Sequence, residues 1–203
     1  MSNDALRVTV MRHGAVTGPA HVLRGKQDAP LSDLGWQQMR DSIALMPPFS
    51  AIFASPLARC RAFTEWFAQE RQLPMNLHAG FAELDFGDWD GLTPAEVAAR
   101  APELFTRFQA DPSGLAPPQG EPFDDFRWRV LSAFAQVTAQ PTAGHQLIVT
   151  HAGVMRVLLS HVLDVNWQAV SRIALPPGGW FRVSLLQGCT PYLLHLNGEQ
   201  CAT

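Results

Sequence analysis

The segment VTVMRHGAV, residues 8 to 16, places Arg12, His13 and Gly14 directly after a run of apolar, β-favouring residues. Polar residues often end a strand, so an ordinary turn is one interpretation. The same three residues also offer a fixed cation, an imidazole that can act as nucleophile or base near neutral pH, and a backbone that can approach another group closely. The segment is therefore either a strand end or part of a catalytic site, and other segments distinguish the two.

Two further segments repeat this arrangement. Arg59 lies in SPLARC, where a helix is expected to begin, and His151 lies in VTHAG, between an expected strand and an expected helix. Ligands of open α/β sheets bind beyond the carboxyl ends of the strands. If the three strands are neighbours, two arginines and two histidines converge on one cleft. Because clustered cations need an anion, and arginine and helix amides suit phosphate oxygens, we predict a phosphate site there.

The elements that must position these residues follow from periodicity and capping signals. Ser32 is a predicted N-cap, Pro56 is expected at the first position of a helix, and Thr93 begins a capping-box spacing. The Pro- and Gly-rich segment 111 to 122 predicts a long surface loop. Strands are expected at 6–11, 49–54, 75–80, 145–150, 180–187 and 192–197, and helices at 32–46, after 56, after 93 with an interruption at Pro102, at 123–139 and at 153–163.

This alternation predicts an α/β protein, a three-layer αβα sandwich whose mostly parallel sheet carries an antiparallel edge strand from a closing hairpin. We see no repeat or linker, so residues 1–203 are expected to form a single domain.

Composition narrows the class of protein. The chain has 203 residues, 47% of them hydrophobic, and a net charge of −3, which gives no general attraction to nucleic acid or a membrane surface. Cys60, Cys189 and Cys201 form no CxxC pair, so neither a disulfide scaffold nor a zinc knuckle is expected. We see no signal peptide and no run of about 18 apolar residues, so a cytoplasmic protein is expected. A homodimer is compatible with the sequence.

Four segments in order, VMRHG, SPLARC, ELDFGDWDGLT and VTHAGVMRVLL, resemble the histidine phosphatase superfamily, which has the phosphoglycerate mutase-like fold. The resemblance runs from about residue 6 to 165. The ELDFGDWDG segment is most similar to the branch that contains α-ribazole phosphatase of cobalamin biosynthesis and small broad-specificity phosphatases.

The resemblance implies that His13 is a nucleophile that forms a phosphohistidine, with its other ring nitrogen donating to a fixed acceptor. It implies that Arg12, Arg59 and His151 bind the phosphoryl oxygens, where charge spreads in the transition state. No metal and no cofactor are expected.

Glu83 matches the general acid of the family, which later acts as the base that activates water. Asp85 and Asp88 lie nearby and are alternatives for this role.

Specificity is expected to come from loops. The segment LRGKQD places Arg24, Gly25 and Gln27 where the family has a substrate-facing loop, and Ala152 is a further expected substrate-binding position. Glu121, in the loop PPQGEP, is a candidate for the other side of the substrate.

The chain departs from the family pattern after the nucleophile. Glu-Thr commonly follows RHG, and Asn stands six positions after the nucleophile, whereas this chain has Ala15, Val16 and Pro19. The loss of that Asn removes a phosphate donor, for which Thr17 or a backbone amide is a candidate replacement.

The leading hypothesis is a metal-independent phosphomonoesterase that acts on small-molecule phosphate monoesters. A phosphoglycerate mutase is an alternative, although the chain ends soon after its last hairpin and has little of the tail with which such mutases exclude water. A zinc or manganese hydrolase built from the same histidines and acids is a second alternative, and a phospholigand-binding domain without turnover is a third.

Overall fold

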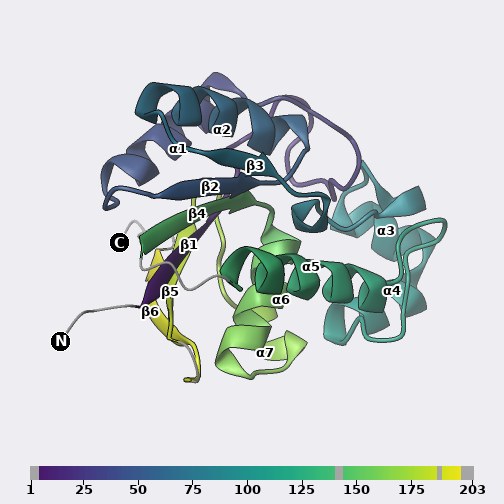
Figure 1. Cartoon of the computed structure of the whole chain (residues 1–203). Helices are drawn as coiled ribbons and strands as arrows, with labels where there is room; N and C mark the ends of the chain where they lie inside the picture. Colours follow the sequence, from purple (N-terminus) through teal and green to yellow (C-terminus); the bar gives the residue numbers. More distant parts are fainter. Residues whose placement is uncertain (1–4, 140–143, 187–188, 198–203) are drawn as a thin grey trace, which may run out of the picture.

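The computed structural model describes residues 5–139, 144–186 and 189–197, which form one six-stranded sheet covered by helices on both faces (Figure 1). The strand order across the sheet is β3-β2-β4-β1-β5-β6. The strands are β1 (Leu6–Arg12), β2 (Ala51–Ala54), β3 (Met75–Leu77), β4 (Gly144–Thr150), β5 (Trp180–Leu185) and β6 (Tyr192–Asn197).

Strand pairing brings three strand ends together. The strands β3, β2, β4 and β1 pair in parallel, whereas β5 runs antiparallel to β1 and β6 runs antiparallel to β5. Arg12 pairs with Thr150, and Ala54 pairs with Val149, so β1, β4 and β2 end at the same edge. The prediction of a mostly parallel sheet with an antiparallel edge is confirmed, and so is the closing hairpin, although residue 187 lies outside the described residues.

The predicted helices are present in the described chain, with different bounds at several ends. Ser32 caps the first helix by accepting from the amide of Gly35, and Thr93 and Glu96 form a complete capping box. The helices are α1 (Asp33–Ala44), α2 (Ala58–Arg71), α3 (Pro94–Arg100), α4 (Pro102–Ala110), α5 (Phe123–Thr138), α6 (Ala152–Leu163) and α7 (Trp167–Ser171), with short 3₁₀ turns η1 (Ala79–Phe81) and η2 (Gly87–Trp89).

Two expectations about local structure were wrong, and one short helix was missed. The second helix begins at Ala58 and not at Pro56, because Leu57 is extended and the Ala58 amide donates to the Asp28 carboxylate at 2.6 Å. The third strand ends at Leu77, since the chain turns into η1 two residues later. The helix α7, of five residues, was not predicted because so short a segment shows no clear periodicity.

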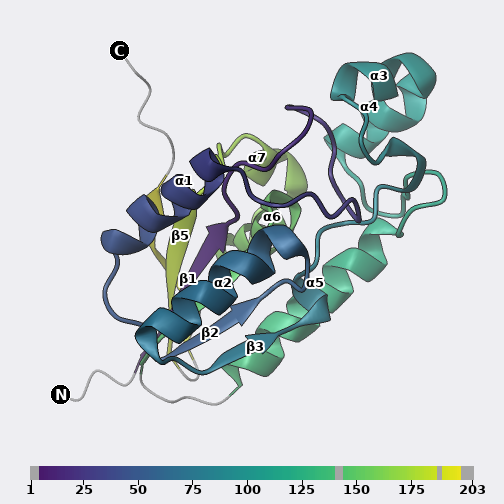
Figure 2. The ribbon, with the colours of Figure 1, turned by 90° about the horizontal axis from the view of Figure 1, so that it is seen from above.

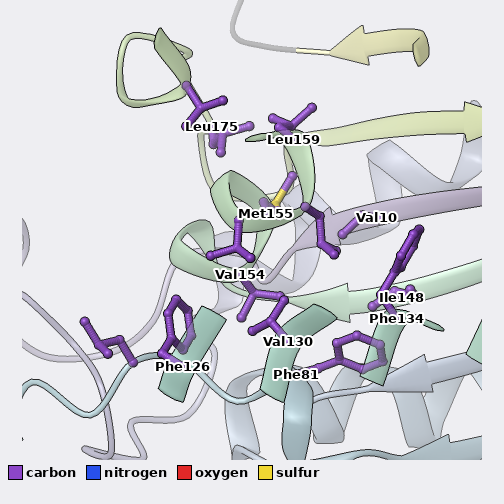
Figure 3. Close-up of a cluster of buried hydrophobic side chains, with 14 of the residues drawn as sticks. Val10, Phe81, Phe126, Val130, Phe134, Ile148, Val154, Met155, Leu159 and Leu175 are labelled. Carbon is purple, nitrogen blue, oxygen red and sulfur yellow. The ribbon is translucent and has the colours of Figure 1, made fainter. Parts of the chain in front are cut away.

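Two apolar cores fill the space above and below the sheet and establish the three-layer sandwich. Val8 and Val10 of β1 point into the core under α5 and α6, whereas Met11 points into the core under α1 and α2. This alternation is the period-2 pattern of a strand buried on both faces. Figure 3 shows the α5–α6 core, in which Phe81 from η1 lies near Val130 and Phe134 of α5. No helix within the described ranges is long and apolar enough to cross a bilayer.

The helices α3 and α4 lie beyond the sheet and widen one end of the molecule (Figure 2). Trp89 anchors them: its ring centroid lies 5.5 Å from that of Phe105 and 5.4 Å from that of Phe108, both at nearly perpendicular angles. Trp89 is 2% exposed, so its ring is buried between its own segment and the helix α4. The pair of helices therefore forms a wall beside the carboxyl ends of the strands.

A buried polar network at the opposite end of the sheet makes stability depend on pH. The Nε2 atom of His145 lies 2.7 Å from the Thr9 hydroxyl, which also accepts from Arg182 at 3.0 Å. The Thr9 hydroxyl therefore donates to His145, and the Nδ1–H of His145 donates to the Pro48 carbonyl at 3.2 Å. Burial, and then the charge of Arg182, lower the pKa of His145 to about 4.

We expect this network to weaken folding in acid. Between pH 6.5 and 4, His145 is protonated in the unfolded chain but neutral in the folded protein. The free energy of unfolding therefore falls as the pH falls, and His145 accounts for at most about 3 kcal/mol of this fall. Urea unfolding of wild type and of His145→Gln, each at pH 7 and at pH 4.5, measures this change in the free energy of unfolding. Wild type should lose more stability than the variant, and equal losses would show that His145 is not the titrating group.

Candidate active site

A cavity of about 780 Å³ opens at the carboxyl ends of the parallel strands. Five residues predicted from the sequence line it: Arg12, His13, Arg24, Glu83 and Ala152. They come from the end of β1, the two loops that follow β1 and η1, and the start of α6. Residues far apart in the chain therefore meet at one place because three strands end there.

His13 is fixed in one tautomer by its own neighbour. Its amide donates to the Thr150 carbonyl at 2.9 Å, which extends the pairing of β1 with β4 past the end of the strand. Its Nδ1 lies 2.7 Å from the Gly14 carbonyl oxygen, which can only accept, so Nδ1 carries the proton. Nε2 is then the ring nitrogen with a free lone pair. The fixed acceptor that the family resemblance implied is thus the Gly14 carbonyl.

Gly14 is required for a close approach of two backbones. A Cβ atom at Gly14 would lie 2.1 Å from the Gly35 carbonyl oxygen, and a Cβ atom at Gly35 would lie 1.9 Å from that of Ala15. The loop after β1 therefore packs directly on the first turn of α1. The glycine of the RHG triplet places His13 by packing on a helix.

Arg12 is held at the cavity wall with part of its guanidinium uncommitted. Nη1 donates to the Leu175 carbonyl at 2.6 Å, and Nε is buried without a hydrogen-bond partner among the described residues. Burial lowers the pKa of Arg12, and the nearby charges of Arg156 and Arg59 lower it further, against an opposing effect of Glu83. A buried cation in this state favours an anion in the cavity.

Arg59 and His151 lie behind His13 and are not among the residues that line the cavity. Both are fully buried, and the His13 and His151 ring centroids are 5.1 Å apart. Arg59 Nε donates to Nδ1 of His151 at 3.2 Å, so the Nε2–H of His151 donates to the Ser55 hydroxyl at 2.7 Å. His151 thus has no uncommitted N–H in this conformation.

Arg59 also holds the loop that was predicted to face the substrate. Its guanidinium donates to the carbonyls of Arg24, Gly25 and Gln27 at 3.1, 2.8 and 2.8 Å. The Asp90 carboxylate accepts from the amides of Gly25 and Gln27 on the other side, at 2.9 and 3.0 Å. The loop is fixed between a buried cation and a carboxylate. Only Arg24 of its three candidate residues lines the cavity, whereas Gly25 and Gln27 do not.

Glu83 presents its carboxylate at the N-terminus of α6. Oε2 accepts from the Gly153 amide at 3.0 Å, and Oε1 accepts from the Leu84 amide at 3.1 Å. A Cβ atom at Gly153 would lie 2.3 Å from Oε1, so the second residue of α6 must be glycine for the carboxylate to sit there. The positive end of the helix dipole favours a carboxylate at this position.

The two alternative acids lie elsewhere. Asp85 pairs with Lys26 at 2.6 Å and accepts from the Gly87 amide at 3.1 Å, and Asp88 is exposed. Neither lines the cavity, whereas Glu83 does. The position of the three carboxylates favours Glu83 as the acid.

Arg156 is a cavity residue that the sequence interpretation missed. It lines the cavity from α6, one helical turn after Ala152. Burial lowers the pKa of Arg156, against an opposing effect of Glu83, and the charge of Arg156 in turn lowers the pKa of Arg12. The four-residue spacing from Ala152 was the signal that could have found it, because residues i and i+4 share a helix face.

Seven aromatic side chains form a further part of the wall. They are Phe86, Trp89, Phe105, Phe108, Phe123, Phe126 and Trp167. The site therefore combines a cationic end near His13 with an apolar chamber.

The positions that depart from the family pattern lie in this site. Ala15, Val16 and Pro19 line the cavity, whereas Thr17, the candidate replacement donor, does not. The Thr17 amide donates to the Pro30 carbonyl at 2.9 Å, and the Ala15 amide donates to the Gln38 side chain at 2.8 Å. Those donors are committed within the protein.

Electrostatics keep both histidines neutral. Burial, followed by the charges of Arg12 and Arg59, lowers the pKa of His13 well below 6.5. Burial, followed by Arg59 and then His13, does the same to the pKa of His151. In the described part of the chain, no group of three or more His, Cys, Asp or Glu side chains is arranged to hold a metal ion.

Comparison with known proteins assigns this chain to a family. A model of the histidine phosphatase superfamily (branch 1) matches residues 8–198, so the chain belongs to that superfamily. The adenosylcobalamin/alpha-ribazole phosphatase of Salmonella typhimurium is 24% identical over 186 residues, which cover 90% of this chain and 92% of that protein. The alpha-ribazole phosphatase structure from Shigella flexneri shares the fold, with a TM-score of 0.82 at 24% identity over 95% of this chain and 96% of that chain.

One relative with higher identity is a longer protein. The bifunctional protein Rv2228c of Mycobacterium tuberculosis is 31% identical over 173 residues, which cover 83% of this chain and 47% of that protein. This chain thus spans about half the length of that relative.

The hydrogen bonds of the two histidines predict opposite tautomers. In ¹⁵N-edited NMR spectra we expect His13 to be protonated on Nδ1 and His151 on Nε2, with both rings neutral at pH 6. In urea-unfolded protein both should titrate near the ordinary value of about 6.5. Protonation of His13 on Nε2, or a His13 titration near 6.5 in the folded protein, would contradict the structure.

Proposed function

We propose that this protein is a metal-independent phosphomonoesterase, a hydrolase that cleaves small-molecule phosphate monoesters through a phosphohistidine on His13 and acid–base catalysis by Glu83. The observation that carries the proposal is the His13 Nδ1 to Gly14 carbonyl hydrogen bond at 2.7 Å, in a ring that lines the same cavity as Glu83. It fixes a neutral imidazole with a free Nε2 lone pair, which is the form a nucleophile requires.

In the first step the Nε2 lone pair attacks phosphorus and the ester oxygen leaves with the electrons of the P–O bond. Glu83, protonated, gives its proton to that oxygen, so an alcohol departs and a carboxylate remains. Negative charge on the phosphoryl oxygens is stabilised by Arg12, whose buried guanidinium retains donor capacity.

In the second step the Glu83 carboxylate takes a proton from water as the water oxygen attacks phosphorus. The P–N bond breaks, inorganic phosphate forms, and its departure returns His13 to the neutral state. The neighbouring Gly153 amide supports the carboxylate form that this step needs.

We retain the prediction that Arg59 and His151 bind phosphoryl oxygens, but the hydrogen bonds of His151 require a rearrangement first. Before His151 can donate to phosphate, the His151–Ser55 bond must be exchanged. In the structure these residues lie behind His13, where the Arg59 charge, after burial and Arg12, helps to lower the pKa of His13.

The apolar chamber supports a substrate whose leaving group has a sizeable apolar or aromatic body. A volume of about 780 Å³ far exceeds what a phosphate group alone would fill. We propose α-ribazole 5′-phosphate as a candidate substrate, which would give the protein a role in cobalamin biosynthesis. A cytoplasmic location and a homodimer remain predictions from the sequence.

Replacement of the nucleophile should abolish turnover without unfolding the protein. We expect His13→Ala to lower kcat for nitrophenyl phosphate on the order of 10⁴-fold or more, because the variant lacks the imidazole that attacks phosphorus. The matched control is His161→Ala, at an exposed position of α6, which should retain wild-type activity. Substantial activity in a folded His13→Ala protein would refute the proposed nucleophile.

The general acid is tested through the leaving group. We expect Glu83→Gln to lower kcat/KM for glycerol phosphate on the order of 10²–10⁴-fold, because an alkoxide needs a proton to leave. With nitrophenyl phosphate, the rate of the first step should fall far less, since nitrophenolate leaves without a proton.

Asp85→Asn and Asp88→Asn are the controls for Glu83→Gln and should show no such dependence on the leaving group. If either reproduces the dependence while Glu83→Gln slows both substrates equally, the acid is misassigned.

A further inference from the structure

Arg129, on α5, is bonded to the backbone of the segment that carries Glu83. Its Nη1 donates to the carbonyls of Gly80 and Ala82 at 3.0 and 2.8 Å, and its Nη2 donates to the carbonyl of Glu83 itself at 3.0 Å. Arg129 is not among the residues that line the cavity. One guanidinium therefore donates to three carbonyls at 3.0 Å or less, and to that of Ala79 at 3.5 Å, in the segment that ends at Glu83.

The other edge of the same guanidinium is held by Glu121. Nε lies 2.6 Å from Oε1 of Glu121, and Nη2 lies 2.9 Å from Oε2. Glu121 is also bonded to the segment itself, since its amide donates to the Asp85 carbonyl at 3.0 Å and its Oε2 accepts from the Asp85 amide at 3.4 Å. The bidentate pair orients the planar fork of Arg129, a geometry that lysine cannot reproduce. Glu121 therefore orients Arg129 from outside the cavity lining.

Close packing leaves the segment little freedom to move. A Cβ atom at Gly80 would lie 2.5 Å from the Ala133 Cβ atom and 2.8 Å from the Arg129 carbonyl oxygen, so η1 lies directly against α5. On the other side, the Thr150 hydroxyl donates to the Phe81 carbonyl at 2.7 Å. The backbone before Glu83 is thus fixed between α5 and the end of β4, while its carboxylate is fixed at α6.

We propose that Arg129, oriented by Glu121, is a positioning residue for the general acid. The proposal rests on the role proposed for Glu83. Loss of the Arg129 fork leaves three carbonyls and the Glu121 carboxylate without their charged partner, and the backbone at Ala82 and Glu83, beyond the packed part of η1, shifts slightly. The Glu83 carboxylate then no longer meets the leaving oxygen, whereas His13, on β1, keeps its place.

The expected signature is a loss of activity that depends on the leaving group. Arg129→Met should lower kcat/KM for glycerol phosphate by about 10²-fold, the cost of a small misplacement of a catalytic group. For nitrophenyl phosphate the first step should fall by less than about threefold, because it needs no proton. The matched control is Arg127→Met, an exposed arginine of the same helix, which should match wild type on both substrates.

Arg129→Lys separates positioning from stability. Lysine keeps the charge opposite Glu121 but cannot span three carbonyls, so we expect most of the thermal stability to return while the glycerol phosphate defect persists. If Arg129→Met does not fold, as judged by circular dichroism, Arg129→Lys carries the test.

A double variant links Arg129 to Glu83. In the Glu83→Gln background, Arg129→Met should add less than about threefold to the loss on glycerol phosphate, since the acid is already absent. Equal losses on the two substrates in folded Arg129 variants, or multiplicative losses in the double variant, would overturn the proposal. If Glu83→Gln itself shows no dependence on the leaving group, the general-acid role of Glu83 is refuted. If Glu83→Gln shows this dependence and the Arg129 variants do not, only the positioning role of Arg129 is refuted.

Discussion

The parallel pairing of β1 with β4 is the constraint on which the site depends. Its register sets Arg12 opposite Thr150, and the His13 amide continues the ladder to the Thr150 carbonyl at 2.9 Å. His13 and His151 thereby become neighbours, with ring centroids 5.1 Å apart. A slip of one residue would exchange the faces of β1, moving Val10 and Met11 into the wrong cores. The two apolar cores therefore hold the histidines together.

Charge is the second organising feature. Three arginines line the cavity, Arg12, Arg24 and Arg156, and Glu83 is the single acidic side chain among the described lining residues. The chain as a whole has a net charge of −3, so this excess of positive charge is local. Buried cations without matching carboxylates are costly, and an anionic ligand offsets that cost. Burial, and then the charges of Arg12 and Arg59, lower the pKa of His13 and keep its ring neutral, which a nucleophile needs. Cations that suit a phosphate therefore also favour the reactive form of the nucleophile.

Local signals were enough to predict most of the fold. Short runs of apolar, β-favouring residues marked β1 and β4, and Ser32 and Thr93 marked helix starts that the structure confirms, because strand preference and capping depend on neighbours in the chain. The start of α2 was misplaced, since it is set by Asp28, 30 residues away. Residues such as Cys201 lie outside the described chain.

The site was predicted only in outline. The strand ends identified Arg12 and His13. No local pattern shows that Arg59 donates hydrogen bonds to the carbonyls of the 24–27 loop, or that Arg129 donates to the backbone next to Glu83. Those roles depend on which carbonyls tertiary packing brings within reach. Identification of the phosphorylated nitrogen tests the central claim most directly. After rapid quenching with labelled substrate, ³¹P NMR and peptide mapping should find an acid-labile, base-stable phosphoryl group on Nε2 of His13, because Nδ1 is bonded to Gly14. A phosphoryl group on Nδ1 or on another residue, or direct attack of water on phosphorus with inversion, would contradict the account.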